Sequence, residues 1–161
     1  MRKTTHWALL FPLIVVACSS NTTSAAKPTS DAASGVTTST QSPGAGQVVN
    51  LSMSEWAIDG PKSIKAGSTT FNVTNKGTLK HELVFARGDS YKALPQEANG
   101  HILEDSIAAS DKPGEAGEVL VGETKSVTLD LKPGKYVLFC NLVVGSLGHA
   151  AKGQILEVTV G

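Results

Sequence analysis

The chain has 161 residues, with 14 Lys or Arg and 14 Asp or Glu, so its formal net charge at pH 7 is zero. Such a balance provides no basic field that would attract phosphate groups, which excludes binding of nucleic acid through charge. The part of the chain that remains after two N-terminal segments, described next, has the length of one ordinary domain.

The N-terminus has the pattern of a targeting segment. A basic start precedes an apolar run, 7–17, that is too short to span a bilayer as a mature helix. The run ends in the sequence VVAC at 15–18, which resembles the lipobox of bacterial lipoproteins, where cleavage precedes a cysteine that then carries lipid. We therefore predict a lipoprotein signal peptide at 1–17 and lipidation at Cys18. The alternative is an ordinary secretory signal with an incidental cysteine.

The next segment, 18–46, consists mostly of Ser, Thr, Ala, Pro and Gly, with almost no large apolar residue. It buries too little surface to offset chain entropy, so we predict a flexible tether between the lipid and a domain at 47–161. If Cys18 carries lipid, Cys140 is left without a disulfide partner, because the chain has only these two cysteines. An exported protein with one leftover cysteine needs a reason for it, and a metal–thiolate bond is one.

From residue 47 onward, apolar residues recur at every second position, which is typical of strands with one buried face. Val49, Leu51 and Met53 alternate with polar residues in this way. Turns that contain Gly or Pro separate the later segments. Further strands are expected at 69–74, 81–86, 118–121, 124–131, 135–140 and 155–160.

The segment 88–117 is the least regular part of the domain, with one weakly helical patch at 101–109. A loop of this length inside a compact β-domain is uncommon, so we expect it to carry a short helix. His101 lies in it and is expected to be a surface residue. The whole pattern predicts an all-β fold, a β-sandwich of seven to eight strands with Greek-key connections and one long irregular insertion.

Three side chains with metal-binding chemistry follow the predicted strands. Cys140 ends a strand, His149 follows a loop that contains two glycines, and His81 opens an earlier strand. Gln154 lies five residues beyond His149 and could approach the same ion along a perpendicular axis. Thiolate with imidazole suits copper in both oxidation states, and zinc would accept the same set.

The pattern from Asn75 to the C-terminus resembles the cupredoxins, the small blue-copper proteins, and among them the plastocyanin-like domains of bacterial lipoproteins. The matching sequences are NKG at 75–77 before HEL at 81–83, then PGKY at 133–136 before Cys140, His149 and Gly153. The resemblance covers the whole predicted domain. It implies one copper ion with His81, Cys140 and His149 as equatorial ligands.

The chain departs from that family in two ways. Gln154 stands where the family usually has methionine, and the only methionines are Met1 and Met53. A glutamine oxygen is a known axial alternative and would favour Cu(II), which lowers the reduction potential. Eight residues separate Cys140 from His149, which is a long loop for the family. We therefore expect His149 to be held less firmly and the metal to be more exposed.

Each candidate ligand also has a plainer interpretation. Cys140 could be a small core residue, His81 a polar strand residue, His149 a solvated loop residue and Gln154 a solvent-facing amide. Asn75 is expected to fix the neighbouring ligand loop through side-chain hydrogen bonds, and the alternative is an ordinary turn asparagine.

We therefore predict a membrane-tethered, extracytoplasmic copper protein that transfers single electrons, with His149 as the electron port and an apolar patch from Leu142, Val143, Val144 and Leu147. A second hypothesis is copper buffering or delivery, and a third is a metal-free interaction module. No catalytic set stands out, so no enzyme activity is expected. We expect a monomer with a redox partner protein, a membrane anchor at Cys18 and no nucleic-acid partner.

Overall fold

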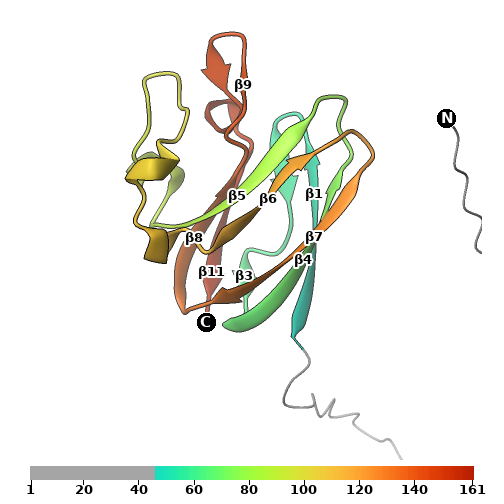
Figure 1. Cartoon of the computed structure of the whole chain (residues 1–161), viewed down its shortest axis with the longest axis vertical. Coiled ribbons are helices and arrows are strands. Elements are labelled where there is room, and N and C mark those ends of the chain that lie inside the picture. The colour runs from blue at the N-terminus through green and yellow to red at the C-terminus, as the bar shows by residue number, and fades with distance from the viewer. Residues whose placement is uncertain (1–45) are drawn as a thin grey trace, which may run out of the picture. The chain divides into compact units, whose positions relative to one another are not determined.

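The computed structural model describes residues 46–161, and the predicted signal peptide, lipidated cysteine and tether lie outside them apart from Gly46. Strands and short 3-10 helices make up the described part (Figure 1). The strands are β1 Gln47–Ser54, β2 Ala57–Asp59, β3 Ser63–Ile64, β4 Gly67–Asn75, β5 His81–Arg87, β6 Gly114–Val119, β7 Thr124–Leu131, β8 Gly134–Phe139, β9 Val143–Val144, β10 Leu147–Gly148 and β11 Ile155–Val160. The 3-10 helices are η1 Tyr91–Ala93, η2 Glu104–Ser106, η3 Ala109–Asp111 and η4 Ala150–Lys152.

Two sheets form the predicted sandwich. One has the strand order β2-β1-β4-β7 and the other β3-β11-β8-β5-β6, while β9 and β10 form a separate hairpin. The chain crosses between the sheets after β2, β3, β4, β6 and β7, and such crossings are typical of a Greek-key sandwich. Four strands that the sequence did not indicate, β2, β3, β9 and β10, are only two or three residues long.

Alternating side chains fill the space between the sheets. In β4 every second residue from Thr69 to Asn75 is buried, as the two-residue periodicity predicted. Phe71 from one sheet and Phe85 from the other are fully buried, and their ring centroids lie 4.7 Å apart. The core at this level is therefore a direct contact between the two sheets.

The insertion covers the outer face of the second sheet, beside β5 and β8 (Figure 1). Its Leu94 and Ile102 are buried in a second apolar cluster with residues that point outward from these strands: Val84, Ala86, Val137 and Phe139. Strands β5 and β8 are thus buried on both faces. This explains why their sequences are nearly continuous apolar runs rather than alternating ones.

The irregular segment differs from its prediction in two details. It contains three 3-10 turns, η1 to η3, instead of one helix at 101–109, and it ends earlier because β6 begins at Gly114. The β6 sequence GEAGEV has no apolar alternation, and its pairing with β5 makes it a strand. Among residues 46–161, no helix has the length and apolar character that crossing a membrane would require.

Candidate metal centre

Strand pairing brings the first two candidate ligands to one end of the second sheet. β5 and β8 are antiparallel, with Val84 opposite Phe139, so His81 at the start of β5 lies at the same end of the sheet as Cys140, which directly follows β8. The β9–β10 hairpin then returns the chain to this end. The backbone N–H of His149 donates to the carbonyl of Leu142 at 2.8 Å, which closes the hairpin.

The donor atoms of His81, Cys140 and His149 all lie within 4.8 Å of one another. Nδ1 of His81 lies 3.4 Å from Nδ1 of His149, and Sγ of Cys140 lies 3.3 Å from the same nitrogen of His149. Two nitrogens bound to one ion at about 2.0–2.1 Å, at angles between tetrahedral and trigonal, lie roughly 3.3–3.6 Å apart. The two imidazoles therefore stand at the separation that a shared metal ion requires.

All four candidate side chains are buried. His81 and Gln154 have no exposed surface, and His149 is only 3% exposed. The alternative interpretation of His149 as a solvated loop residue is therefore wrong, and the buried donors do not support the more exposed metal that the long loop suggested. The long loop does not leave the histidine in solvent, because other segments, described below, hold it against the sandwich.

Burial also sets the protonation of the candidate ligands. It raises the pKa of the Cys140 thiol to about 11, although the backbone N–H groups of Glu82 and Leu142 act in the opposite direction. The N–H of Glu82 donates to Sγ at 3.2 Å. Burial lowers the pKa of both His81 and His149, so both imidazoles are neutral at pH 7 and have a lone pair for a metal.

Gln154 lies at the same site, and a hydrogen bond fixes the orientation of its side-chain amide. Its Nε2 donates to the carbonyl of Ser54 at 2.8 Å, while its Oε1 is buried with no hydrogen-bond partner in the described part of the chain. A buried acceptor without a partner is costly, and a cation beside it would remove that cost. The donor set thus fits a metal: one thiol, two imidazoles and one free amide oxygen.

Comparisons with known proteins bear on the fold of the domain. No protein-family model and no curated protein matches the chain. The crystal structure of dithionite-reduced auracyanin from Roseiflexus castenholzii matches with a TM-score of 0.54 and 20% identity, over 73% of this chain and 99% of that one. Auracyanin B matches with a TM-score of 0.52 and 19% identity, over 71% and 88%.

This chain has the cupredoxin fold. The resemblance drawn from the sequence is therefore confirmed for the architecture. At these identities the match shows the fold alone, so the ligand assignment depends on the chain's own residues.

Asn75 braces the loop that leads to His81 in this cupredoxin fold. Its Nδ2 donates to the carbonyl oxygens of Leu79 and Val119 at 2.8 and 2.9 Å, and its Oδ1 accepts from the N–H of Gly77 at 2.9 Å. The side chain is 1% exposed. These three bonds connect β4, the 76–80 loop and β6, so they fix the point at which β5 begins with His81.

The turn between β1 and β2 contacts the site through three consecutive residues, none of which the sequence singled out. Ser54 accepts the bond from Gln154, and Oε1 of Glu55 lies 3.4 Å from Nε2 of His81. The Trp56 ring meets the His149 ring edge-on, with centroids 4.8 Å apart. Only the closure of the sandwich brings this turn to ligands that lie 26 to 100 residues away in the chain, so no local pattern could have indicated it.

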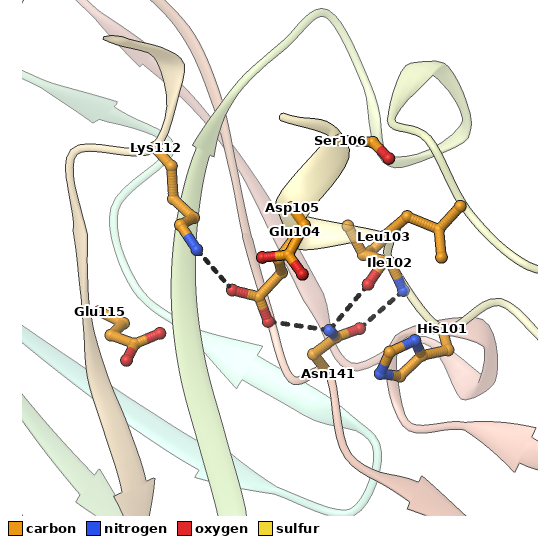
Figure 2. A pocket seen from close by; sticks show the side chains of 9 residues that line it. All are labelled: His101, Ile102, Leu103, Glu104, Asp105, Ser106, Lys112, Glu115 and Asn141. Carbon is orange, nitrogen blue, oxygen red and sulfur yellow. Dashed lines mark hydrogen bonds and ion pairs between the residues drawn. The ribbon is translucent and has the colours of Figure 1, made fainter. Parts of the chain in front are cut away.

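The insertion holds the ligand loop from the other side (Figure 2). Oδ1 of Asn141 accepts from the N–H of Ile102 at 2.7 Å, and its Nδ2 donates to the Ile102 carbonyl and to Glu104 at 3.0 and 2.9 Å. The N–H of Gly148 donates to the carbonyl of Asn99 at 2.9 Å. Both ends of the loop between Cys140 and His149 are therefore tied to the insertion.

His101 differs from the surface residue that was expected. It is half-buried beside Asn141, and its Nδ1 is buried with no hydrogen-bond partner among residues 46–161 (Figure 2). It is not part of the cluster formed by His81, Cys140 and His149. Within the described residues, this cluster is the only group of three or more His, Cys, Asp or Glu whose donor atoms converge.

Proposed function

We propose that the domain at 47–161 binds one copper ion and transfers single electrons. His81, Cys140 and His149 would hold the ion through one thiolate and two imidazole nitrogens, and Oε1 of Gln154 would be a fourth donor. The observation that carries the proposal is the convergence of one thiol and one nitrogen of each imidazole within 4.8 Å, with the two Nδ1 atoms 3.4 Å apart. Copper bound by such a set supplies a one-electron couple between Cu(I) and Cu(II).

The protein's part in this function is to hold the donors in place. His81 and Cys140 stand at the ends of paired strands, and the His149 loop is tied to the insertion through Asn141. Donor atoms that are held rigidly move little when the oxidation state of the ion changes. Because little rearrangement is needed, electron transfer stays fast. Burial of all four donors also supports long retention of the ion, which favours electron transfer over copper delivery.

The route for the electron would run through His149. Val143, Val144 and Leu147 in the adjacent hairpin are exposed, at 45%, 37% and 43%, while Leu142 packs against the core. Three exposed apolar side chains beside a buried histidine support a contact surface for a redox partner protein at this end. Leu142 is partly buried against the core, so three of the four residues of the expected patch are exposed.

The first experiment is the visible spectrum of the purified domain 47–161 after addition of Cu(II). The wild-type domain is expected to gain an intense thiolate-to-copper absorption, and Cys140→Ser is expected to lose it. A colourless wild-type complex would refute a type 1 copper site. Reversible voltammetry then separates the two copper functions, because a sluggish, irreversible response would favour buffering or delivery over electron transfer.

We further propose that the mature protein works outside the cytoplasmic membrane, anchored by lipid on Cys18 and extended on the tether at 18–46. The sequence VVAC at 15–18 supports this proposal. Expression of the full chain should yield a protein in the membrane fraction whose N-terminal peptide carries diacylglyceryl mass. Cys18→Ala should move it out of that fraction, and an unchanged distribution would contradict the anchor.

A further inference from the structure

The outer nitrogen of His81 faces a carboxylate. Nε2 lies 3.4 Å from Oε1 of Glu55, and it has no hydrogen-bond partner of normal geometry among residues 46–161. A distance of 3.4 Å is longer than an ordinary N–H···O hydrogen bond. The pair is therefore a close contact between a buried imidazole and a negative charge, and its effect on His81 is electrostatic and orienting.

The carboxylate of Glu55 is itself held in place. Its Oε1 accepts from the N–H groups of Thr78 and Leu79, each at 2.7 Å. A Cβ atom on Gly77 would come within 2.6 Å of Oε1 and 2.8 Å of Oε2, so the carboxylate occupies space that only glycine leaves open. Backbone N–H groups that donate to a carboxylate favour its charged form, so these two bonds hold Glu55 as an anion beside His81.

The carboxylate faces Nε2 of His81 and not Nδ1, and this decides which tautomer of the imidazole is favoured. A neutral imidazole has its proton on one nitrogen and a lone pair on the other. A negative oxygen beside Nε2 favours the proton there, which leaves the lone pair on Nδ1, the atom that faces Cys140 and His149. The same charge lies close enough to the cluster to act on any ion that the cluster holds.

We propose that Glu55 is a positioning residue of the metal centre, which fixes His81 in the Nε2–H tautomer and stabilises Cu(II) relative to Cu(I). The second part rests on the proposed function, and the first part does not. The sign follows from charge, because a nearby carboxylate attracts a doubly charged ion more strongly than a singly charged one. The carboxylate also makes the imidazole a stronger donor, which acts in the same direction.

The first test needs no metal. In the metal-free wild-type domain, the ¹⁵N spectrum of the imidazoles is expected to show the His81 proton on Nε2. In Glu55→Ala the Nδ1–H form should become populated, provided that circular dichroism shows a folded domain. A wild-type spectrum with the proton on Nδ1 would overturn the proposal without any variant. This result stands whether or not the domain binds copper.

The second test uses Glu55→Gln, which keeps an oxygen for the Thr78 and Leu79 N–H groups and removes only the charge. The ratio of the Cu(II) to the Cu(I) dissociation constant is expected to rise by about tenfold, or ~59 mV in reduction potential for a one-electron couple. Asp130→Asn is the control, because it removes one exposed charge beside the start of β4, at the far end of the sheet. A shift no larger than that of the control would overturn the electrostatic role.

These outcomes separate the two proposals. A wild-type domain without the thiolate-to-copper absorption would refute the proposed function, and the tautomer of His81 would then decide the role of Glu55 alone. A coloured wild-type domain whose Glu55→Gln variant behaves like the control would refute the electrostatic role of Glu55 and leave the copper site intact.

Discussion

Nε2 of Gln154 donates a 2.8 Å hydrogen bond to the backbone carbonyl of Ser54, and this bond fixes the orientation of the whole amide. The oxygen at its other end, Oε1, is buried and has no partner within the described residues. Leaving such an acceptor unsatisfied costs about 1–3 kcal/mol in the folded state. A cation beside the oxygen would remove this cost, which supports Gln154 as the proposed fourth ligand.

The first prediction replaces this oxygen with a softer donor. Gln154→Met should raise the reduction potential by about 59 mV or more, a tenfold shift toward Cu(I), because a thioether stabilises Cu(I) better than an amide oxygen does. Voltammetry of the copper-loaded domain gives the value. Gln96→Met is the control, since Gln96 bonds to backbone carbonyls of the insertion. A potential that stays at the wild-type value would show that Gln154 does not touch the metal.

The second prediction concerns protons released on metal binding. Burial raises the pKa of Cys140 to about 11, whereas both candidate histidines are neutral at pH 8 because burial lowers their pKa. Binding of Cu(II) at pH 8 should therefore release about one proton, and the apparent affinity should rise about tenfold per pH unit below the thiol pKa. Calorimetry in buffers of different ionisation enthalpy measures the proton count. Release of no proton would mean that the thiol does not bind as thiolate.

The third prediction concerns the brace at Asn75. Asn75→Ala removes three hydrogen bonds and leaves buried backbone groups without partners, so the metal-free domain should lose about 2–4 kcal/mol of stability. Urea denaturation provides the measurement. Asn72→Ala, which removes exposed bonds to Asn50 and Ser126, should cost less than about 1 kcal/mol. Equal losses in the two variants would contradict the brace.

The fourth prediction concerns the tie between the insertion and the ligand loop. Asn141→Ala removes the bonds to Ile102 and Glu104, so the loop that carries His149 should become more mobile. Copper should then pass to a competing chelator several-fold faster than from wild type, with a stability loss of about 1–3 kcal/mol. Asn50→Ala, an exposed site on β1, is the control. A stability loss with an unchanged release rate would show that the insertion supports the fold but not the site.

The sequence by itself determined most of the long strands and the order of the candidate ligands along the chain. One-face burial imposes a two-residue period that can be read locally, as in β4 and β7, and the candidate ligands stand at strand ends or just beyond them. The approach of His81 to Cys140 follows once β5 pairs with β8, whereas the β9–β10 hairpin places His149. The sequence pattern missed the first four residues of β6, 114–117, because they have no apolar alternation and form a strand only by pairing with β5.

Only the tertiary structure decided what surrounds the ligands. Ser54, Glu55 and Trp56 reach the site from the opposite sheet, and their sequence has no feature that distinguishes them from any other turn. The burial of His149 likewise depends on packing. The sequence of a long loop with glycines is compatible with an exposed histidine, and the contact between Asn141 and the insertion holds this loop against the domain. The physical reason is that these contacts join residues far apart in the chain. Periodicity indicates which face of a segment is buried, but the segment that covers this face is decided only when the two sheets pack together.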